Sequence, residues 1–167
     1  ANSVWTGTDM IVWGGTTNSG NPMFIDTFYN TGGRYNPETD MWTTLPTVNA
    51  PSTNRVNVYL LWTGSKMITW GGMGSTLASY LNTGGTYDIA TNSWSEINSA
   101  GAPPPRTLGA HVWTGKDMIV WGGFGNMSAQ HNDGGIYSLS GNSWTYISTT
   151  NAPQHLAYVH AAWPGSK

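Results

Sequence analysis

Few residues of this chain could do chemistry. The 167-residue sequence contains no cysteine, which excludes disulfides, thiolate nucleophiles and cysteine-ligated metals. Its four histidines show no metal-site spacing such as HExxH, and no GxGxxG or P-loop string is present. His131 and Asp133, in the stretch QHNDGG, are a pair that could hold a metal, but a polar turn at a loop tip is the simpler explanation. We therefore expect no cofactor, no metal and no catalytic constellation in this segment.

The composition narrows the class of protein further. Only 8% of the residues are charged, 13% are aromatic, and the chain has 22 Gly and 10 Trp, which favours short strands and turns over helices. The formal net charge of −2 and the thinly spread Lys and Arg argue against a nucleic-acid partner. No apolar run approaches the roughly 18 residues of a transmembrane helix, so we expect no transmembrane segment.

The same eleven residues occur three times. The copies are WTGTDMIVWGG from Trp5, WTGSKMITWGG from Trp62 and WTGKDMIVWGG from Trp113, and a fragment of a fourth copy begins near Trp163. A second string follows each complete copy, in the versions GGRYNPETDMW, GGTYDIATNSW and GGIYSLSGNSW. A period near 50 residues, with short strands separated by turns, indicates the blades of a β-propeller.

Each repeat is expected to form four short antiparallel strands, A to D. Strand A ends at the first Trp, strand B ends at a glycine pair, strand C begins at the second glycine pair, and strand D opens with another Trp. The predicted blades cover residues 1–45, 56–97 and 107–147, and residues 156–167 begin the next one. Glycines at strand ends permit positive φ, and Tyr and Trp fill the wedge between blades. The repeat residues expected to build this frame are Gly14, Gly15, Gly71, Gly72, Gly122, Gly123, Tyr35, Tyr87, Tyr137, Trp42, Trp94 and Trp144.

These strings resemble the kelch repeat, in the form found in exported and surface proteins of bacteria. The resemblance covers residues 1–163 and implies an all-β propeller that usually closes with six or seven blades. Arg55 and Arg106 match the arginine position of the repeat, but the usual histidine position does not hold a histidine, so no role is carried over to it. Galactose oxidases share this type of propeller, yet their tyrosine–cysteine cofactor cannot form in a segment without cysteine.

Three blades do not close such a ring. The two outer blade faces would expose tryptophan and tyrosine, which soluble monomers avoid. Either further blades of a longer chain cover these faces, or self-association of two chains makes a six-bladed ring. We expect the first arrangement, because strand A of the first blade and the strand near Trp163 would compete for one place in a self-paired ring.

A partner is expected on one face of the array. Strands A to D alternate in direction, so the B–C and D–A loops share a face, and the B–C loops differ most between repeats. The first B–C loop, residues 16–31, is the longest, and its apolar side chains suit either a protein interface or a lid on the blade's own edge. The candidate binding residues on this face are Phe24, Phe28, Tyr29, Tyr80, Phe124, His131, Asp133, Arg55 and Arg106.

Arg55 and Arg106 end the two D–A loops. A guanidinium at that place could contact a ligand carboxylate, or it could hydrogen-bond loop carbonyls of the adjacent blade, which is the alternative we favour. The tryptophans could bind a sugar, but packing between blades accounts for all ten.

Three functions remain. The first is a non-catalytic binding scaffold that presents variable loops to a protein or other ligand outside the cytoplasm. The second is a segment of a propeller enzyme whose site is completed by absent blades. The third is a structural subunit of an extracellular assembly, joined through its open blade faces.

Overall fold

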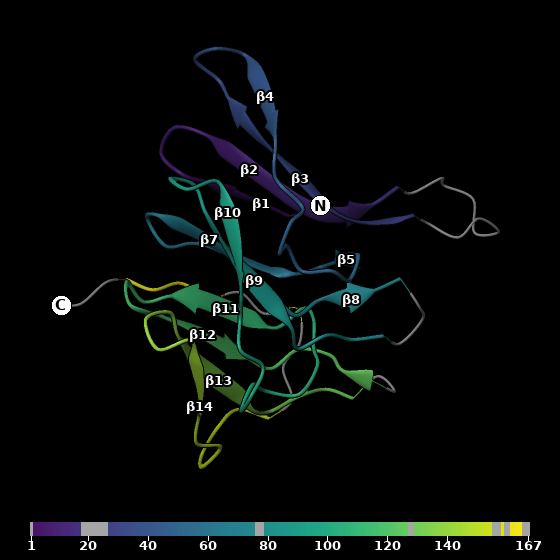
Figure 1. Ribbon diagram of the computed structural model, residues 1–167. Helices are drawn as coiled ribbons and strands as arrows, with labels where there is room; N and C mark the ends of the chain where they lie inside the picture. The colour runs from purple at the N-terminus through teal and green to yellow at the C-terminus, as the bar shows by residue number, and fades with distance from the viewer. Residues whose placement is uncertain are drawn as a thin grey trace.

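The computed structural model describes residues 2–17, 27–75, 79–126, 129–154, 158 and 161–164. These residues form three four-stranded sheets and contain no α-helix (Figure 1). Blade 1 consists of β1 (Asn2–Trp5), β2 (Met10–Thr16), β3 (Phe28–Asn36) and β4 (Met41–Thr44). Blade 2 consists of β6 (Tyr59–Trp62), β7 (Lys66–Trp70), β9 (Gly84–Asp88) and β10 (Ser93–Glu96). Blade 3 consists of β11 (Ala110–Trp113), β12 (Asp117–Trp121), β13 (Gly134–Ser138) and β14 (Ser143–Tyr146).

The strand order confirms the repeat prediction. Each sheet is antiparallel and keeps the order of the chain from strand A to strand D. The predicted ends of strand A at Trp5, Trp62 and Trp113 are correct. No helix of the described residues is long and apolar enough to cross a membrane.

One tyrosine per blade closes the turn between strands C and D. Its ring lies beside the Trp directly opposite on strand D, and its hydroxyl donates a hydrogen bond to an Asp or Asn in the turn. Each acceptor residue has positive φ, a conformation that Asn and Asp tolerate better than most residues. The bonded pairs are Tyr35 and Asp40 (2.8 Å), Tyr87 and Asn92 (2.7 Å), and Tyr137 and Asn142 (2.9 Å).

Tryptophan pairs join successive blades. Trp94 of blade 2 packs on Trp13 of blade 1 with ring centroids 4.5 Å apart, and Trp144 of blade 3 packs on Trp70 of blade 2 at 4.9 Å. The indole N–H of Trp94 also donates to the carbonyl of Pro46, in the connection between blades 1 and 2 (2.9 Å). The prediction that these rings fill the wedges is therefore confirmed at both interfaces.

The prediction for the first B–C loop is partly wrong. β2 does not end at the glycine pair but runs through Gly14 and Gly15 to Thr16, and β3 begins at Phe28. The pairing register shifts between Trp13 and Gly15, so the glycines form a β-bulge and the hairpin continues beyond it. Phe28 therefore lies on a strand, in a segment that was expected to be loop.

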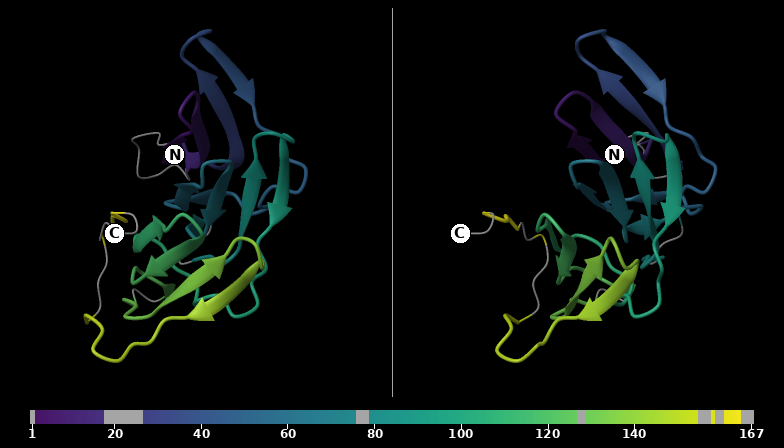
Figure 2. Two further views of the ribbon diagram at one scale, coloured as in Figure 1. Left: turned by 90° about the vertical axis from the view of Figure 1, so that its left-hand side faces the viewer. Right: turned by 60° about the vertical axis from the view of Figure 1, so that its left-hand side comes forward.

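The two end blades leave their outer faces open. Figure 2 shows the blades fanned in succession without closing a ring. Trp42 of blade 1 is 57% exposed, whereas its equivalents Trp94 and Trp144 are 3% and 9% exposed, because only the latter two have a preceding blade to cover them.

Candidate functional site

The B–C and D–A loops share one face, as strand alternation predicts. The short strands β5 (Arg55–Val56) and β8 (Met73–Gly74) pair with each other, which joins the end of a D–A loop to the start of a B–C loop. In blade 3 an isolated bridge between Thr107 and Phe124 makes the same connection. We call this side of the molecule the loop face.

Arg106 clamps the base of the third B–C loop. Its Nη1 donates to the carbonyls of Gly122 (3.1 Å) and Asp133 (2.8 Å), which stand at the two ends of that loop. Its Nε donates to the carbonyl of Pro104 (3.0 Å), and its Nη2 pairs with Oδ1 of Asp133 at 2.6 Å. The side chain is completely buried, so these bonds replace its hydration.

Arg55 repeats this clamp in blade 2. Its Nη1 donates to the carbonyls of Gly71 (3.2 Å) and Thr83 (2.7 Å), at the two ends of the second B–C loop. Its Nε donates to the carbonyl of Thr53 (3.0 Å), and its Nη2 donates to the hydroxyl of Thr83 (3.2 Å). Burial lowers the pKa of Arg55 to about 10, because desolvation opposes the charged form.

The arginines therefore hold the scaffold together, and their side chains are buried. The sequence left two roles open for these arginines, contact with a ligand carboxylate or hydrogen bonds to loop carbonyls, and the structure shows the hydrogen bonds to loop carbonyls. These carbonyls belong to the same blade, which corrects the expectation that they belong to the adjacent one. The backbone makes the link between blades, because the carbonyl of Arg106 accepts from the N–H of Gly72 in blade 2 (2.9 Å).

Asp133 serves the clamp of blade 3. Its Oδ2 accepts a hydrogen bond from the hydroxyl of Tyr146 (2.8 Å), and its Oδ1 lies 3.6 Å from Nδ1 of His131. Burial alone would raise the pKa of Asp133, but the hydrogen bonds from Tyr146 and Arg106 outweigh it and lower this pKa. In the described part of the chain, no group of three or more His, Asp or Glu side chains is placed to hold a metal ion.

Apolar side chains surround a hollow on the loop face. Tyr80 and Phe124, two of the residues expected to bind a partner, lie on it together, and the ring of Phe124 contacts that of Tyr158 at 5.3 Å. The hollow has a volume of about 250 Å³, and a second one of about 280 Å³ adjoins it. We call the apolar residues around the first hollow the loop-face cluster; they are Met73, Tyr80, Leu108, Phe124 and Tyr158.

Three residues shared by the two hollows have an unusual backbone. Asn57 and Leu108 stand just before strand A of blades 2 and 3, Tyr158 holds the equivalent place in the sequence of the partial fourth repeat, and their φ angles are 52°, 57° and 57°. The described residues 161–164, where the sequence predicts the next strand A, form no strand. This left-handed conformation suits Asn but strains Leu and Tyr, and such strain is commonly kept where a side chain must be held in place for function. Sequence reasoning missed this set, although aligning the repeats at Arg55 and Arg106 shows the equivalence of Asn57 and Leu108.

The other expected interface residues do not join this cluster. Phe28 and Tyr29 pair with Thr16 and Gly15 across the extended hairpin of blade 1, and neither lines the two hollows. Phe24 lies outside the described residues. The proposed role of this aromatic group as a joint anchor therefore remains a prediction.

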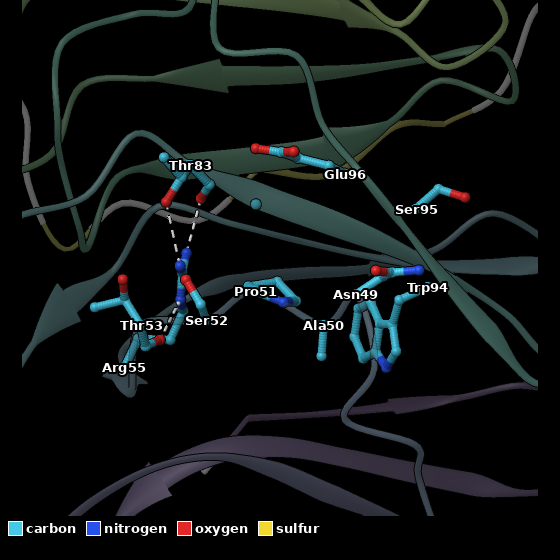
Figure 3. A pocket seen from close by; sticks show the side chains of 11 residues that line it. Asn49, Ala50, Pro51, Ser52, Thr53, Arg55, Thr83, Trp94, Ser95 and Glu96 are labelled. Atoms are coloured by element: carbon cyan, nitrogen blue, oxygen red, sulfur yellow. Dashed lines mark hydrogen bonds between the residues drawn. The ribbon is translucent and has the colours of Figure 1, made fainter.

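A larger polar pocket lies beside the Arg55 clamp (Figure 3). It has a volume of about 570 Å³ and lies between the connection from blade 1 to blade 2 and the strands β9 and β10. Arg55 and Thr83 stand at one end of it and Trp94 at the other, and the side chain of Glu96 extends over it. The sequence did not predict this pocket.

Tandem four-stranded blades, joined by tryptophans and clamped by a buried arginine, define a propeller of the kelch type. A family model described as the KLHDC2/KLHL20/DRC7 Kelch-repeats domain matches residues 1–167, and the chain belongs to this family. No curated protein matches the sequence. Among solved structures, one titled "Structure of YjhT" superposes with a TM-score of 0.72 at 15% sequence identity. The alignment covers 93% of this chain and 53% of that one, so the chain spans about half the length of that protein.

Proposed function

We propose that this chain is a protein-interaction scaffold and that its partner docks on the loop face over the loop-face cluster. One observation carries the proposal: the aromatic residues Tyr80, Phe124 and Tyr158 line one hollow on the side where the loops vary between repeats. Protein interfaces concentrate their binding energy in such aromatic anchors, especially when they stand on a rigid frame.

The frame beneath this hollow is rigid for an identifiable reason. The arginine clamps tie together both ends of the second and third B–C loops, and these are the loops that carry Tyr80 and Phe124. A partner therefore meets side chains that are already positioned, which reduces the entropy lost on binding.

Two finer proposals accompany the scaffold role. We propose that further blades cover the two open faces, because the indole of Trp42 is exposed where Trp94 and Trp144 are covered. We also propose that the protein acts outside the cytoplasm, which its low content of charged residues supports. Fractionation of the source cells tests the location, and a location confined to the cytoplasm would contradict it.

Selection of binders from a displayed library of random linear peptides tests the docking surface. We expect the selected peptides to carry apolar or aromatic anchors and to lose at least tenfold in affinity with the variants Phe124→Ser and Tyr80→Ser, as measured by fluorescence polarisation. Trp5→Ser is the matched control, since Trp5 is an exposed aromatic residue outside the cluster and at the opposite end of strand A from the loop face. Peptides that bind both cluster variants as tightly as the original protein would contradict the proposal.

A further inference from the structure

Blades 2 and 3 differ at two positions beside the arginine clamp. In blade 3 the space next to Arg106 contains the carboxylate of Asp133 and the ring of Tyr146, whose hydroxyl is bonded to that carboxylate. The same two places of the repeat hold Thr83 and Glu96 in blade 2, where the pocket of about 570 Å³ lies. The repeat therefore supplies its own comparison: Asp133 and Tyr146 stand beside Arg106 in blade 3, and Thr83 and Glu96 line the pocket beside Arg55 in blade 2.

In blade 2 the buried guanidinium of Arg55 has no counter-ion among the described residues. Arg55 is 1% exposed, and no carboxylate among the described residues forms an ion pair with it. Its five N–H groups make four hydrogen bonds, three to carbonyls and one to the Thr83 hydroxyl. One guanidinium N–H thus has no acceptor among the described residues, and the Thr83 hydroxyl, which accepts from Arg55, keeps its own proton available for donation.

The remaining walls of the pocket are polar as well. The connection contributes Ser52 and Thr53, where blade 3 has two prolines in the equivalent stretch, and β10 contributes the exposed carboxylate of Glu96. The indole of Trp94 is only 3% exposed because it packs on Trp13, so it offers little surface for stacking a sugar. A cationic end and an anionic rim favour a ligand with one charge of each sign.

We propose that this pocket binds a small zwitterion of the amino-acid class. The ligand carboxylate accepts hydrogen bonds from Arg55 and the Thr83 hydroxyl, and so takes the place that the Asp133 carboxylate holds beside Arg106 in blade 3. The ligand ammonium group lies toward Glu96. This site is separate from the loop-face cluster, so the proposal of a zwitterion site does not depend on the proposed partner surface.

Titration with a series of ω-amino acids, from glycine to 6-aminohexanoate, tests the proposal at constant ionic strength. Binding is measured by saturation-transfer NMR and calorimetry, with acetate and methylammonium as ligands that carry only one of the two charges. We expect at least one member of the series to bind at least tenfold more tightly than acetate. Failure of the whole series to bind at 100 mM would overturn the proposal, as would acetate binding as tightly as the best member.

A variant that closes the pocket provides a second, independent test of the binding site. The variant Thr83→Asp/Glu96→Tyr installs the blade 3 residues and is expected to lower affinity at least tenfold. Its matched control, Thr150→Asp/Glu38→Tyr, makes the same two changes at exposed positions outside the pocket and should bind as the original protein does. Unchanged binding by the closed variant would overturn the assignment of the site.

Two single variants keep the test decisive if the double variant fails to fold. Thr83→Asp alone is expected to abolish binding and raise the Tm, because it gives Arg55 the counter-ion that Arg106 already has. Glu96→Gln changes only the exposed rim, and it is expected to weaken binding of the best ω-amino acid about threefold without weakening that of acetate. Tight binding that survives Thr83→Asp would refute the role of Arg55.

Discussion

The three equivalent tryptophans of strand D allow the packing of blades to be tested within one chain. Trp94 is 3% exposed and Trp42 is 57% exposed, although both pair with a tyrosine in the same register. For a side chain that can bury up to about 250 Å², this difference corresponds to roughly 130 Å². At about 25 cal/mol per Å² it is equivalent to about 3 kcal/mol. We therefore expect Trp94→Ala to lower the free energy of unfolding by about 3 kcal/mol more than Trp42→Ala does, and by about 5 kcal/mol in total, since a cavity is added to the lost burial.

The same area-based estimate gives the expected costs of truncating the other two strand D tryptophans, Trp42 and Trp144. Trp42→Ala is expected to cost about 2 kcal/mol, because less than half of that indole is covered. Trp144→Ala is expected to cost about 1 kcal/mol less than Trp94→Ala. The reason is that the N–H of Trp94 bonds to the Pro46 carbonyl, whereas that of Trp144 has no acceptor among the residues that the structure describes.

Urea unfolding followed by far-UV circular dichroism measures these values. Fluorescence is less suitable, because ten tryptophans contribute to the signal. The measurement is repeated at several protein concentrations, so that self-association through the open faces is detected as a concentration-dependent midpoint. If Trp42→Ala costs as much as Trp94→Ala at every concentration, the exposure of Trp42 does not describe the protein in solution, and the reasoning is refuted.

Other expected outcomes follow from the clamp, the strained cluster and the turn tyrosines. Asp133→Asn leaves Arg106 buried without its counter-ion and should cost about 3 kcal/mol at pH 7. Folding lowers the pKa of Asp133, so the stability that this carboxylate contributes is fully present above its unfolded pKa of about 3.9 and is lost as the pH falls through its folded pKa. In an acid titration, the difference in stability between the variant and the original protein should therefore shrink over this pH range. Leu108→Asn, which copies the residue at the equivalent position 57, should raise the free energy of unfolding by up to about 1 kcal/mol while weakening peptide binding at the cluster; a loss of stability would contradict the assigned strain. Tyr87→Phe removes one hydrogen bond to the C–D turn and should cost about 1 kcal/mol in thermal unfolding, with no effect on peptide binding.

Much of the fold could be read from the repeats because their pattern is local. A strand shows its period over five residues, and three copies of one string impose the same hairpin three times. The order of strands, the ends of strand A and the tryptophans between blades followed from this pattern. The first B–C hairpin did not, because a glycine pair has the same local preference whether it ends a strand or forms a bulge, and the partner strand decides between the two.

The site depended on contacts between residues far apart in the chain. Tyr80 and Phe124 could be assigned to the loop face from strand alternation, but their meeting with Leu108 and Tyr158 follows from how successive blades are fanned. The arginine positions were visible in the repeat, yet whether a guanidinium faces water or carbonyls depends on which groups surround it after folding. The polar pocket is the clearest case: the repeat shows that Thr83 takes the place of Asp133, but only the packed structure shows a pocket beside the buried guanidinium of Arg55.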